Sequence, residues 1–296
     1  MIFSSVLEKT LSLRKKSSMN ENIESVKRYN LWYGNTIDCG FLRPLYIASI
    51  NQYLGSKVVK VLTGQRRVGK SYILRQTAMH LMQQGVSGNN IVFINRELTA
   101  FDFIENYKDL DNFIRLYRQE LKPEGRIYIF IDEVQDIEGW ERVVNSLSQD
   151  YTEDYELFIT GSNSKMFSGE LSTLLSGRYV EFHIFPLSYE EYASIHQLSV
   201  GKQSYMQYMA DGGYPELVNF QSSDVKRNYI SGLKPCIFGA LASWLRCVCG
   251  QYQGQRGGFR SHQERPYSLC TSYLLAYRRT HYRARVCSVG THCRQL

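Results

Sequence analysis

The chain has 296 residues, of which 43% are hydrophobic and 21% charged, and its formal net charge is +7 at pH 7. This composition excludes an intrinsically disordered chain, because it supplies enough apolar side chains for a full core and a second, smaller domain. No apolar run approaches the length of a membrane helix, so we expect a cytoplasmic protein with no membrane partner. The first twenty residues lack the apolar core of a signal peptide, and Met1 and Met19 are both candidate start residues.

The first strong pattern along the chain is the octet at residues 64–71, Gly-Gln-Arg-Arg-Val-Gly-Lys-Ser, which fits G-x-x-x-x-G-K-[ST] at each fixed position. A β-branched run at residues 57–63 precedes the octet, and residues 71–82 follow it with helical apolar spacing. This strand, loop and helix order is the context that the motif requires, and it disfavours a coincidental glycine turn. The octet therefore predicts a site for a nucleoside triphosphate, which we expect to be ATP.

The chemistry of this phosphate loop follows from its residue types. The two glycines let backbone N–H groups turn toward a phosphate at the positive end of the following helix. Lys70 is expected to reach the β- and γ-phosphates, and the Ser71 hydroxyl is expected to ligate Mg2+. The predicted nucleotide-binding residues are Gly64, Gln65, Arg66, Arg67, Val68, Gly69, Lys70, Ser71 and Tyr72.

Apolar runs and helical patterns alternate from residue 57 to about residue 197, which predicts a parallel sheet with helices on both faces. A helix is expected over residues 103–121, whose apolar residues share one face. The expected strands are residues 57–63, 91–95, 127–132, 156–160 and 179–184.

Two adjacent acids end the third of these strands. In phosphate-loop enzymes an acid at such a strand end completes the coordination of Mg2+, which is the role predicted for Asp132. The next residue, Glu133, is placed to orient and deprotonate the attacking water. A helix cap or a solvated turn is the alternative interpretation of the pair, and its position downstream of a phosphate loop favours catalysis.

Two further positions carry polar groups that suit phosphoryl transfer. Residues 160–163, Thr-Gly-Ser-Asn, could hold the water or sense the γ-phosphate, or could cap a helix starting near Lys165. Arg178 is a candidate arginine finger, because charge that develops on the phosphoryl oxygens needs a fixed cation. A surface salt bridge is the alternative for this arginine.

The composition changes abruptly after residue 233. Residues 234–296 contain ten basic residues against one acidic residue, a charge of +9, whereas residues 1–233 contain 25 against 27, a charge of −2. Six of the seven cysteines also lie beyond this boundary. A metal module, a divergent basic tail and translation in a wrong reading frame are the three interpretations. The missing C-x-x-C pair disfavours metal, and the irregular, acid-poor composition favours a disordered or frame-disrupted tail.

Several short segments occur in a characteristic order: FLRPLY at 41–46, the phosphate loop at 63–71, FIDEVQ at 130–135, GWE at 139–141, TGSNS at 160–164, LLSGR at 174–178, FPLSYEE at 185–191 and GGYPE at 212–216. Together they resemble the successive signatures of a prokaryotic AAA-type, ASCE P-loop ATPase family that has a carboxy-terminal domain of unknown function. The resemblance covers about residues 41–233. It is lost beyond Leu233, where we expect the second domain to be truncated or frame-disrupted.

The resemblance implies an α/β fold, a P-loop NTPase three-layer sandwich with parallel sheet order 5-1-4-3-2, followed by a small helical segment and an irregular tail. It also implies a sensor role for Ser162 and Asn163 and a finger role for Arg178. The predicted catalytic residues are Glu133, Lys70, Arg178 and Asn163, and the predicted metal ligands are Ser71 and Asp132. The expected parts are an N-terminal extension at 1–40, the ATPase domain at 41–197, the helical start of the second domain at 198–233 and the tail at 234–296.

Two functions from different classes fit these patterns, and a truncated remnant with little activity is a third reading. The first is an Mg2+-dependent ATPase that hydrolyses ATP to ADP and phosphate to drive a conformational cycle, with the altered carboxy-terminus able to impair it. The second is an ATP-gated switch for DNA or a protein partner, with little turnover. Glu133 and Arg178 favour the ATPase, because a switch needs neither a base nor a finger. The candidate partners are ATP, further copies of the chain in a homo-oligomer, and DNA or a protein bound through the second domain; the sequence leaves open whether Arg178 acts in cis or in trans.

Overall fold

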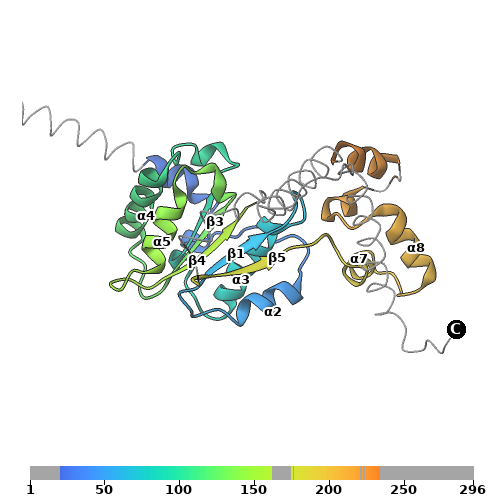
Figure 1. The fold of residues 1–296 in the computed structure, drawn as a ribbon, viewed down its shortest axis with the longest axis horizontal. Coiled ribbons are helices and arrows are strands. Elements are labelled where there is room, and N and C mark those ends of the chain that lie inside the picture. The colour runs from blue at the N-terminus through green and yellow to red at the C-terminus, as the bar shows by residue number, and fades with distance from the viewer. Residues whose placement is uncertain (1–20, 162–174, 176, 221, 223, 234–296) are drawn as a thin grey trace, which may run out of the picture. The chain divides into compact units, whose positions relative to one another are not determined.

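The computed structural model describes residues 21–161, 175, 177–220, 222 and 224–233. Its centre is a sheet of five strands in the order β2-β3-β4-β1-β5, and each neighbouring pair is parallel (Figure 1). Read from the other edge, this is the expected order 5-1-4-3-2, so the predicted topology is confirmed. The strands are β1 (Val59–Thr63), β2 (Ile91–Asn95), β3 (Ile127–Asp132), β4 (Tyr155–Thr160) and β5 (Tyr179–His183).

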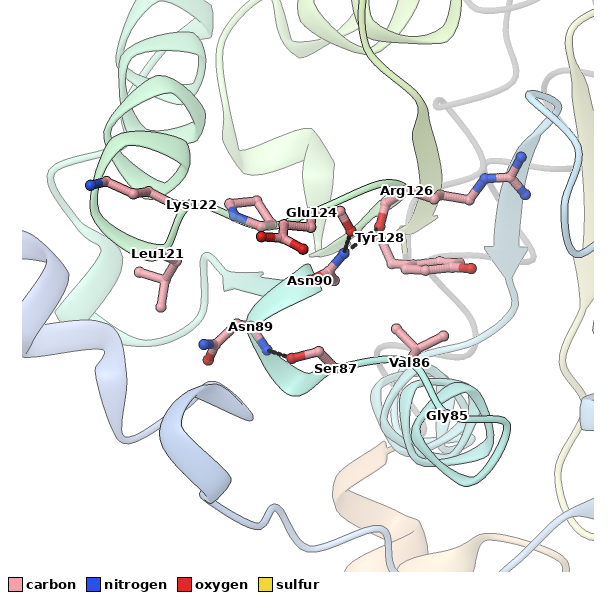
Figure 2. A pocket seen from close by; sticks show the side chains of 11 residues that line it. Gly85, Val86, Ser87, Asn89, Asn90, Leu121, Lys122, Glu124, Arg126 and Tyr128 are labelled. Atoms are coloured by element: carbon pink, nitrogen blue, oxygen red, sulfur yellow. Dashed lines mark hydrogen bonds between the residues drawn. The ribbon is translucent and has the colours of Figure 1, made fainter.

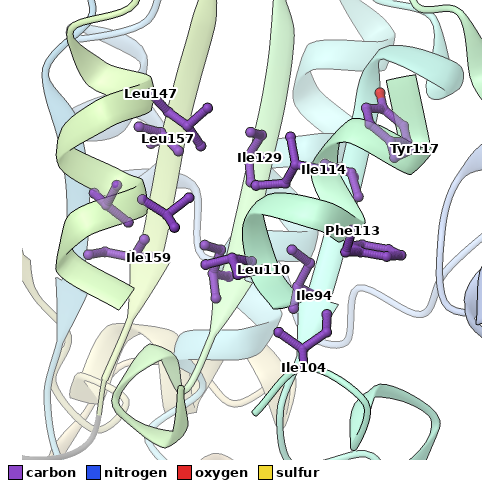
Figure 3. Close-up of a cluster of buried hydrophobic side chains, with 14 of the residues drawn as sticks. Ile94, Ile104, Leu110, Phe113, Ile114, Tyr117, Ile129, Leu147, Leu157 and Ile159 are labelled. Carbon is purple, nitrogen blue, oxygen red and sulfur yellow. The ribbon is translucent and has the colours of Figure 1, made fainter. Parts of the chain in front are cut away.

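Helices cover both faces of the sheet (Figure 1). One face packs against α4 (Tyr107–Leu121) and α5 (Trp140–Ser148), and the other packs against α2 (Pro44–Asn51) and α3 (Lys70–Gln83). The sequence of α4 shows why, since Leu110, Phe113, Ile114 and Tyr117 recur at helical spacing and are buried. In Figure 3 these side chains meet apolar residues of the strands. Short 3-10 helices lie at Trp32–Gly34, Gly88–Asn90, Thr99–Phe101 and Val134–Asp136.

Two predicted boundaries differ from the structure by two residues or more. The helix expected from residue 103 begins at Tyr107, because Asn106 caps it and forms a capping box with Asp109. The strand expected from residue 57 begins at Val59, whose N–H donates to the Arg178 carbonyl and opens the ladder with β5. Both shifts occur where a hydrogen bond, which periodicity does not register, sets the end of the element.

The segment before residue 41, interpreted from the sequence as an extension, packs into the same core in its described part. Residues 21–27 are helical, and the Trp32 ring stacks on Tyr117 at 5.6 Å. The Trp32 Nε1–H donates to the Ile91 carbonyl at 2.8 Å, and the Asn30 amide bonds both the N–H and the carbonyl of Phe93. Ile91 and Phe93 belong to the outermost strand, β2, so this segment satisfies backbone groups that the edge of a sheet would leave open.

Beyond β5 the chain becomes helical, as expected for residues 198–233. The elements are α7 (Tyr189–Ile195), α8 (Lys202–Asp211), a 3-10 helix at Pro215–Asn219 and helical residues at 224–233. Asp211 joins them, since its carboxylate accepts from the Tyr192 hydroxyl and from the Lys226 ammonium. Within the described ranges, no helix is long and apolar enough to cross a bilayer. The interpretations of Ser162, Asn163 and residues 234–296 concern positions outside the described residues.

Candidate functional site

Parallel pairing brings three polar strand ends together at the carboxyl end of the sheet. Thr63 ends β1, Asp132 ends β3 and Thr160 ends β4, and β4 lies between the other two strands. Ligands of open parallel sheets bind outside the carboxyl ends of the strands. The phosphate loop leaves β1 at this same end of the sheet, so the loop and the predicted acids lie on one side of the molecule.

The loop adopts left-handed backbone angles at three positions. Gly64 has φ 141°, Arg67 has φ 66° and Gly69 has φ 96°. At Gly64 an added β-carbon would lie 2.3 Å from the Ile184 carbonyl oxygen, so this position admits only glycine. Gly69 immediately precedes α3, whose first turn starts at Lys70. The loop therefore delivers its backbone to the positive end of a 14-residue helix, where anions bind favourably.

Lys70 is the cation of the site. Its side chain is almost fully buried, and Nζ donates to the carbonyls of Gly64 at 3.2 Å and Gln65 at 3.1 Å. Nζ also lies 3.7 Å from the Glu133 Oε1 atom. Burial lowers the pKa of Lys70, and the negative charges of Glu133 and Asp132 oppose that shift. A buried ammonium inside a curled loop is suited to bind a polyphosphate.

Asp132 and Ser71 form an oxygen-donor pair beside the loop. The Asp132 carboxylate accepts a hydrogen bond from the Thr160 hydroxyl at 2.6 Å, and Ser71 and Asp132 line the same cavity. Burial raises the pKa of Asp132, and the Thr160 and Ser71 hydroxyls oppose the rise. A hydroxyl and a carboxylate are hard oxygen ligands, which is the donor chemistry that Mg2+ prefers. The residues present therefore fit the metal expected at this position.

Glu133 is held beside Asp132 in a left-handed conformation with φ 53°. Its N–H donates to the Thr160 hydroxyl at 2.9 Å, and its Oε2 atom accepts from the Gln135 amide at 2.5 Å. The side chain is 7% exposed. Thr160 thus bonds both acids at once, to the side chain of Asp132 and to the backbone of Glu133. The sequence suggested that Thr160 could hold the water or sense the γ-phosphate, and that role stays a prediction.

Arg178 lies at the opposite end of the sheet, where the strands begin. It immediately precedes β5, its carbonyl accepts from the N–H of Val59 at the start of β1, and its exposed guanidinium donates to Asn145 in α5 at 3.0 Å. The five residues of β1 separate it from the phosphate loop, a distance of roughly 16 Å at the rise of a strand. The structure therefore does not bring Arg178 to the phosphate loop of its own chain.

The sequence did not predict the side-chain contacts that residues of the phosphate loop make with other parts of the chain. The Gln65 side chain accepts from the Tyr214 hydroxyl at 2.9 Å, and the Arg67 guanidinium donates to the Tyr229 hydroxyl at 3.2 Å. Arg66 lies 3.4 Å from Glu97, which follows β2. The pKa of Glu97 is raised by burial and by the charges of Glu133 and Asp132. Of these contact partners, only Tyr214 could have been identified from the sequence, because it belongs to the GGYPE segment.

Two cavities lie at opposite ends of the strands. One of about 510 Å³ adjoins the amino ends of β2 and β3, where the Asn90 amide donates to the carbonyls of Glu124 at 2.6 Å and Arg126 at 2.9 Å (Figure 2). The other, of about 240 Å³, is lined by Ser71 and Asp132. The smaller cavity is therefore the one that adjoins the candidate metal ligands.

The chain is similar to a known protein family and to curated proteins. Residues 56–193 match the profile of a family described as AAA domain. An uncharacterized protein of Haemophilus influenzae is 38% identical over 199 residues, which cover 64% of this chain and 48% of that protein. An uncharacterized protein of Methanocaldococcus jannaschii is 27% identical over 190 residues, covering 59% of this chain and 40% of that protein. The chain thus spans about half the length, or less, of these curated relatives.

Solved structures with a similar arrangement include two named proteins. The Thermotoga maritima RuvB Holliday junction branch migration motor is 15% identical, with a TM-score of 0.40, and the match covers 64% of this chain and 60% of that one. The Aeropyrum pernix Orc1 protein in complex with DNA is also 15% identical, with a TM-score of 0.39, and the match covers 61% of this chain and 53% of that one.

Proposed function

We propose that this chain, whose residues 56–193 form an AAA-type P-loop domain, binds ATP with Mg2+ and hydrolyses it to ADP and phosphate. The observation that carries the proposal is the position of Glu133. Its buried carboxylate lies 3.7 Å from the loop cation Lys70 and adjoins Asp132, to which it is tied through Thr160. A site that only bound nucleotide would need the cation and the metal ligand, whereas a second, oriented carboxylate suits a general base.

Each residue has a defined task in this proposal. Lys70 offsets the negative charge of the β- and γ-phosphates, and the loop N–H groups donate to the same oxygens. Ser71 and Asp132 hold Mg2+, which supplies positive charge to the phosphate oxygens when bound. The Glu133 carboxylate orients a water and takes its proton as the water oxygen bonds to the γ-phosphorus and the bond to the leaving ADP oxygen breaks.

The second candidate function, an ATP-gated switch for a DNA or protein partner, has its own supporting observation. The loop residues Gln65 and Arg67 bond Tyr214 and Tyr229, which belong to the helical part beyond β5. A phosphate in the loop would compete with or reinforce these contacts, and the helical part could transmit the difference to a partner. The two functions are compatible, because turnover would reset such a switch.

Assembly is part of the proposal. Since Arg178 lies far from the loop of its own chain, its finger role requires a neighbouring subunit that brings it to the γ-phosphate in trans. A homo-oligomer would meet this requirement, and a surface salt bridge remains the alternative role for this arginine. A DNA or protein partner that binds through the second domain is likewise part of the proposal.

Titration calorimetry with Mg2+ and ATP, paired with a phosphate-release assay, tests the function. Lys70→Ala should abolish ATP binding, whereas Lys57→Ala, the same change at an exposed lysine, should not alter it. Glu133→Gln should keep ATP affinity and reduce turnover by roughly 100-fold or more, the effect of a lost general base. Unchanged affinity in Lys70→Ala would refute the site. Unchanged turnover in Glu133→Gln would leave the switch as the better function.

A further inference from the structure

Arg43 is a buried arginine that connects the phosphate loop to the helices beyond β5. Its side chain is 4% exposed, and its guanidinium donates to the Val68 carbonyl of the loop at 3.1 Å. The same group donates to the Phe185 carbonyl at 2.9 Å and forms two hydrogen bonds, at 2.8 and 2.9 Å, with the Glu191 carboxylate in α7. One planar cation therefore bridges the loop, the segment after β5 and α7. Such a bidentate pair fixes the guanidinium in orientation as well as in position.

The contact with Val68 has a geometric consequence for the next residue. The Val68 carbonyl and the Gly69 N–H belong to one planar peptide unit, and the described residues contain no cis peptide bond. In a trans peptide the two groups point in opposite directions. When Arg43 holds the Val68 oxygen on its own side, the Gly69 N–H is directed away from Arg43. Gly69 has φ 96°, so glycine rather than a substituted residue can follow this peptide orientation.

Arg43 is itself held from two sides. Its N–H donates to the Gln76 side chain of α3 at 3.0 Å, and the Gln76 amide bonds the carbonyls of Cys39 and Phe41, so the segment around Arg43 is fixed to α3. The guanidinium depends on Glu191, which also caps its own helix by accepting from the Ser188 N–H at 2.8 Å. The position of α7 therefore influences the orientation of the Arg43 guanidinium through the Glu191 carboxylate.

We propose that Arg43 is a positioning residue for the phosphate loop and that the Arg43–Glu191 pair couples the position of α7 to the Val68–Gly69 peptide. With α7 docked, the peptide presents the Gly69 N–H to a bound phosphate. With α7 displaced, the guanidinium loses its carboxylate partner, the peptide is free to rotate and anion affinity falls. By reciprocity, a nucleotide in the loop strengthens the docking of α7. The coupling rests on the proposed ATP site, and it assigns a regulatory input to that site.

The test compares ATP dissociation constants and steady-state kinetics of four variants. Arg43→Ala should weaken ATP binding at least about tenfold, the effect of one lost hydrogen bond from a charged donor. Glu191→Gln keeps the shape of the side chain and should weaken binding by a smaller factor. The double variant should match Arg43→Ala, because the effect of Glu191 passes through Arg43. The rate at saturating ATP should change less than the KM, and Arg43→Lys, which keeps the charge, should restore part of the affinity.

Arg126→Ala is the matched control. Arg126 also bridges two carboxylates, Asp154 at 2.8 Å and Glu156 at 3.2 Å, at the amino end of the sheet. This variant should lower the Tm and leave ATP affinity unchanged. An Arg43→Ala protein that is folded and binds ATP as tightly as the wild type would overturn the proposal. So would a Glu191→Gln effect that persists undiminished in the Arg43→Ala background. If Arg43→Ala does not fold, Arg43→Lys and Glu191→Gln decide the question.

Amide hydrogen exchange of the ligand-free protein separates this coupling from the ATP site. The peptide that contains Gly69 should exchange faster in Glu191→Gln than in the wild type and should be unaffected in Arg126→Ala. This readout requires no nucleotide, so it tests the coupling even if the wild type fails to bind ATP, which would refute the proposed function alone. Equal exchange in wild type and Glu191→Gln would refute the coupling while leaving the ATP site intact.

Discussion

Thr160 offers the sharpest test of how the two acids are organised. Its hydroxyl donates to Asp132 at 2.6 Å and accepts from the Glu133 N–H at 2.9 Å, and the residue is fully buried. Thr160→Val keeps the shape of the side chain and removes both hydrogen bonds. Valine therefore creates no cavity, and the variant leaves a buried carboxylate oxygen and a buried N–H without this partner.

The expected magnitude follows from those two groups. A hydrogen bond to a charged acceptor contributes about 1.5–3 kcal/mol and a neutral one about 1 kcal/mol, so the variant should lose about 2.5–4 kcal/mol of unfolding free energy. Burial already raises the pKa of Asp132, and loss of the Thr160 donor raises it further. A carboxyl with a raised pKa costs stability as the pH rises through its titration range, so the difference between variant and wild type should shrink as the pH falls and Asp132 becomes protonated.

The raised pKa of Asp132 in Thr160→Val should also change the pH dependence of metal binding. Mg2+ needs the ionised carboxylate, so Mg2+-dependent ATP binding should fail at a higher pH in Thr160→Val than in the wild type. Turnover at neutral pH should drop at least about tenfold, because neither acid is held in place. Urea unfolding across a pH series and calorimetry with Mg2+ and ATP measure these effects.

Thr77→Val is the control for Thr160→Val, because Thr77 is also buried and its hydroxyl donates only to a backbone carbonyl of its own helix, at 2.8 Å. It should lose little stability and leave the pH dependence of Mg2+ binding unchanged. A Thr160→Val protein with wild-type Mg2+ affinity and pH profile would refute the organising role of this hydroxyl.

Three further predictions concern the loop, the finger and the helical part. Gly64→Ala should abolish ATP binding, since its β-carbon would meet a backbone carbonyl at 2.3 Å; calorimetry that finds normal affinity would contradict this. Arg178→Ala should lower turnover at constant ATP affinity, and mixing it with Lys70→Ala protein should partly restore phosphate release if the finger acts in trans; turnover independent of protein concentration would argue against that arrangement. Burial raises the pKa of Asp211, but Lys226 and Tyr192 outweigh burial and hold the pKa below its usual value. The ionised Asp211 therefore stabilises the fold above the ordinary aspartate pKa, and this stabilisation is lost as the pH falls through the lowered pKa. Lys226→Met should therefore lower the urea midpoint at about pH 8, and the difference from the wild type should narrow as the pH falls toward about 5, because burial and Lys226 both lower the pKa of the neighbouring His196; a difference that widened over this range would contradict the assignment.

The sequence determined the parts of this protein that depend on local order. A phosphate loop is recognisable because the residue types that its chemistry needs lie within eight consecutive positions. The strands were predicted from apolar runs, and their order followed from the resemblance to an AAA-type family, which the match over residues 56–193 supports. Asp132 and Glu133 were identified because they end a strand, and parallel strands end at one edge.

Only the tertiary structure decided how residues far apart in the chain share one site. The role of Thr160 depends on β4 lying between β1 and β3, and the place of Arg178 depends on its pairing with the start of β1 rather than its end. The bond from Arg43 to the Val68 carbonyl spans 25 residues, and its bonds to Glu191 span 148. Hydrophobic periodicity reports which face of an element is buried but carries no information about which distant polar group a side chain will meet, because that depends on register and on the directions in which the packed elements point.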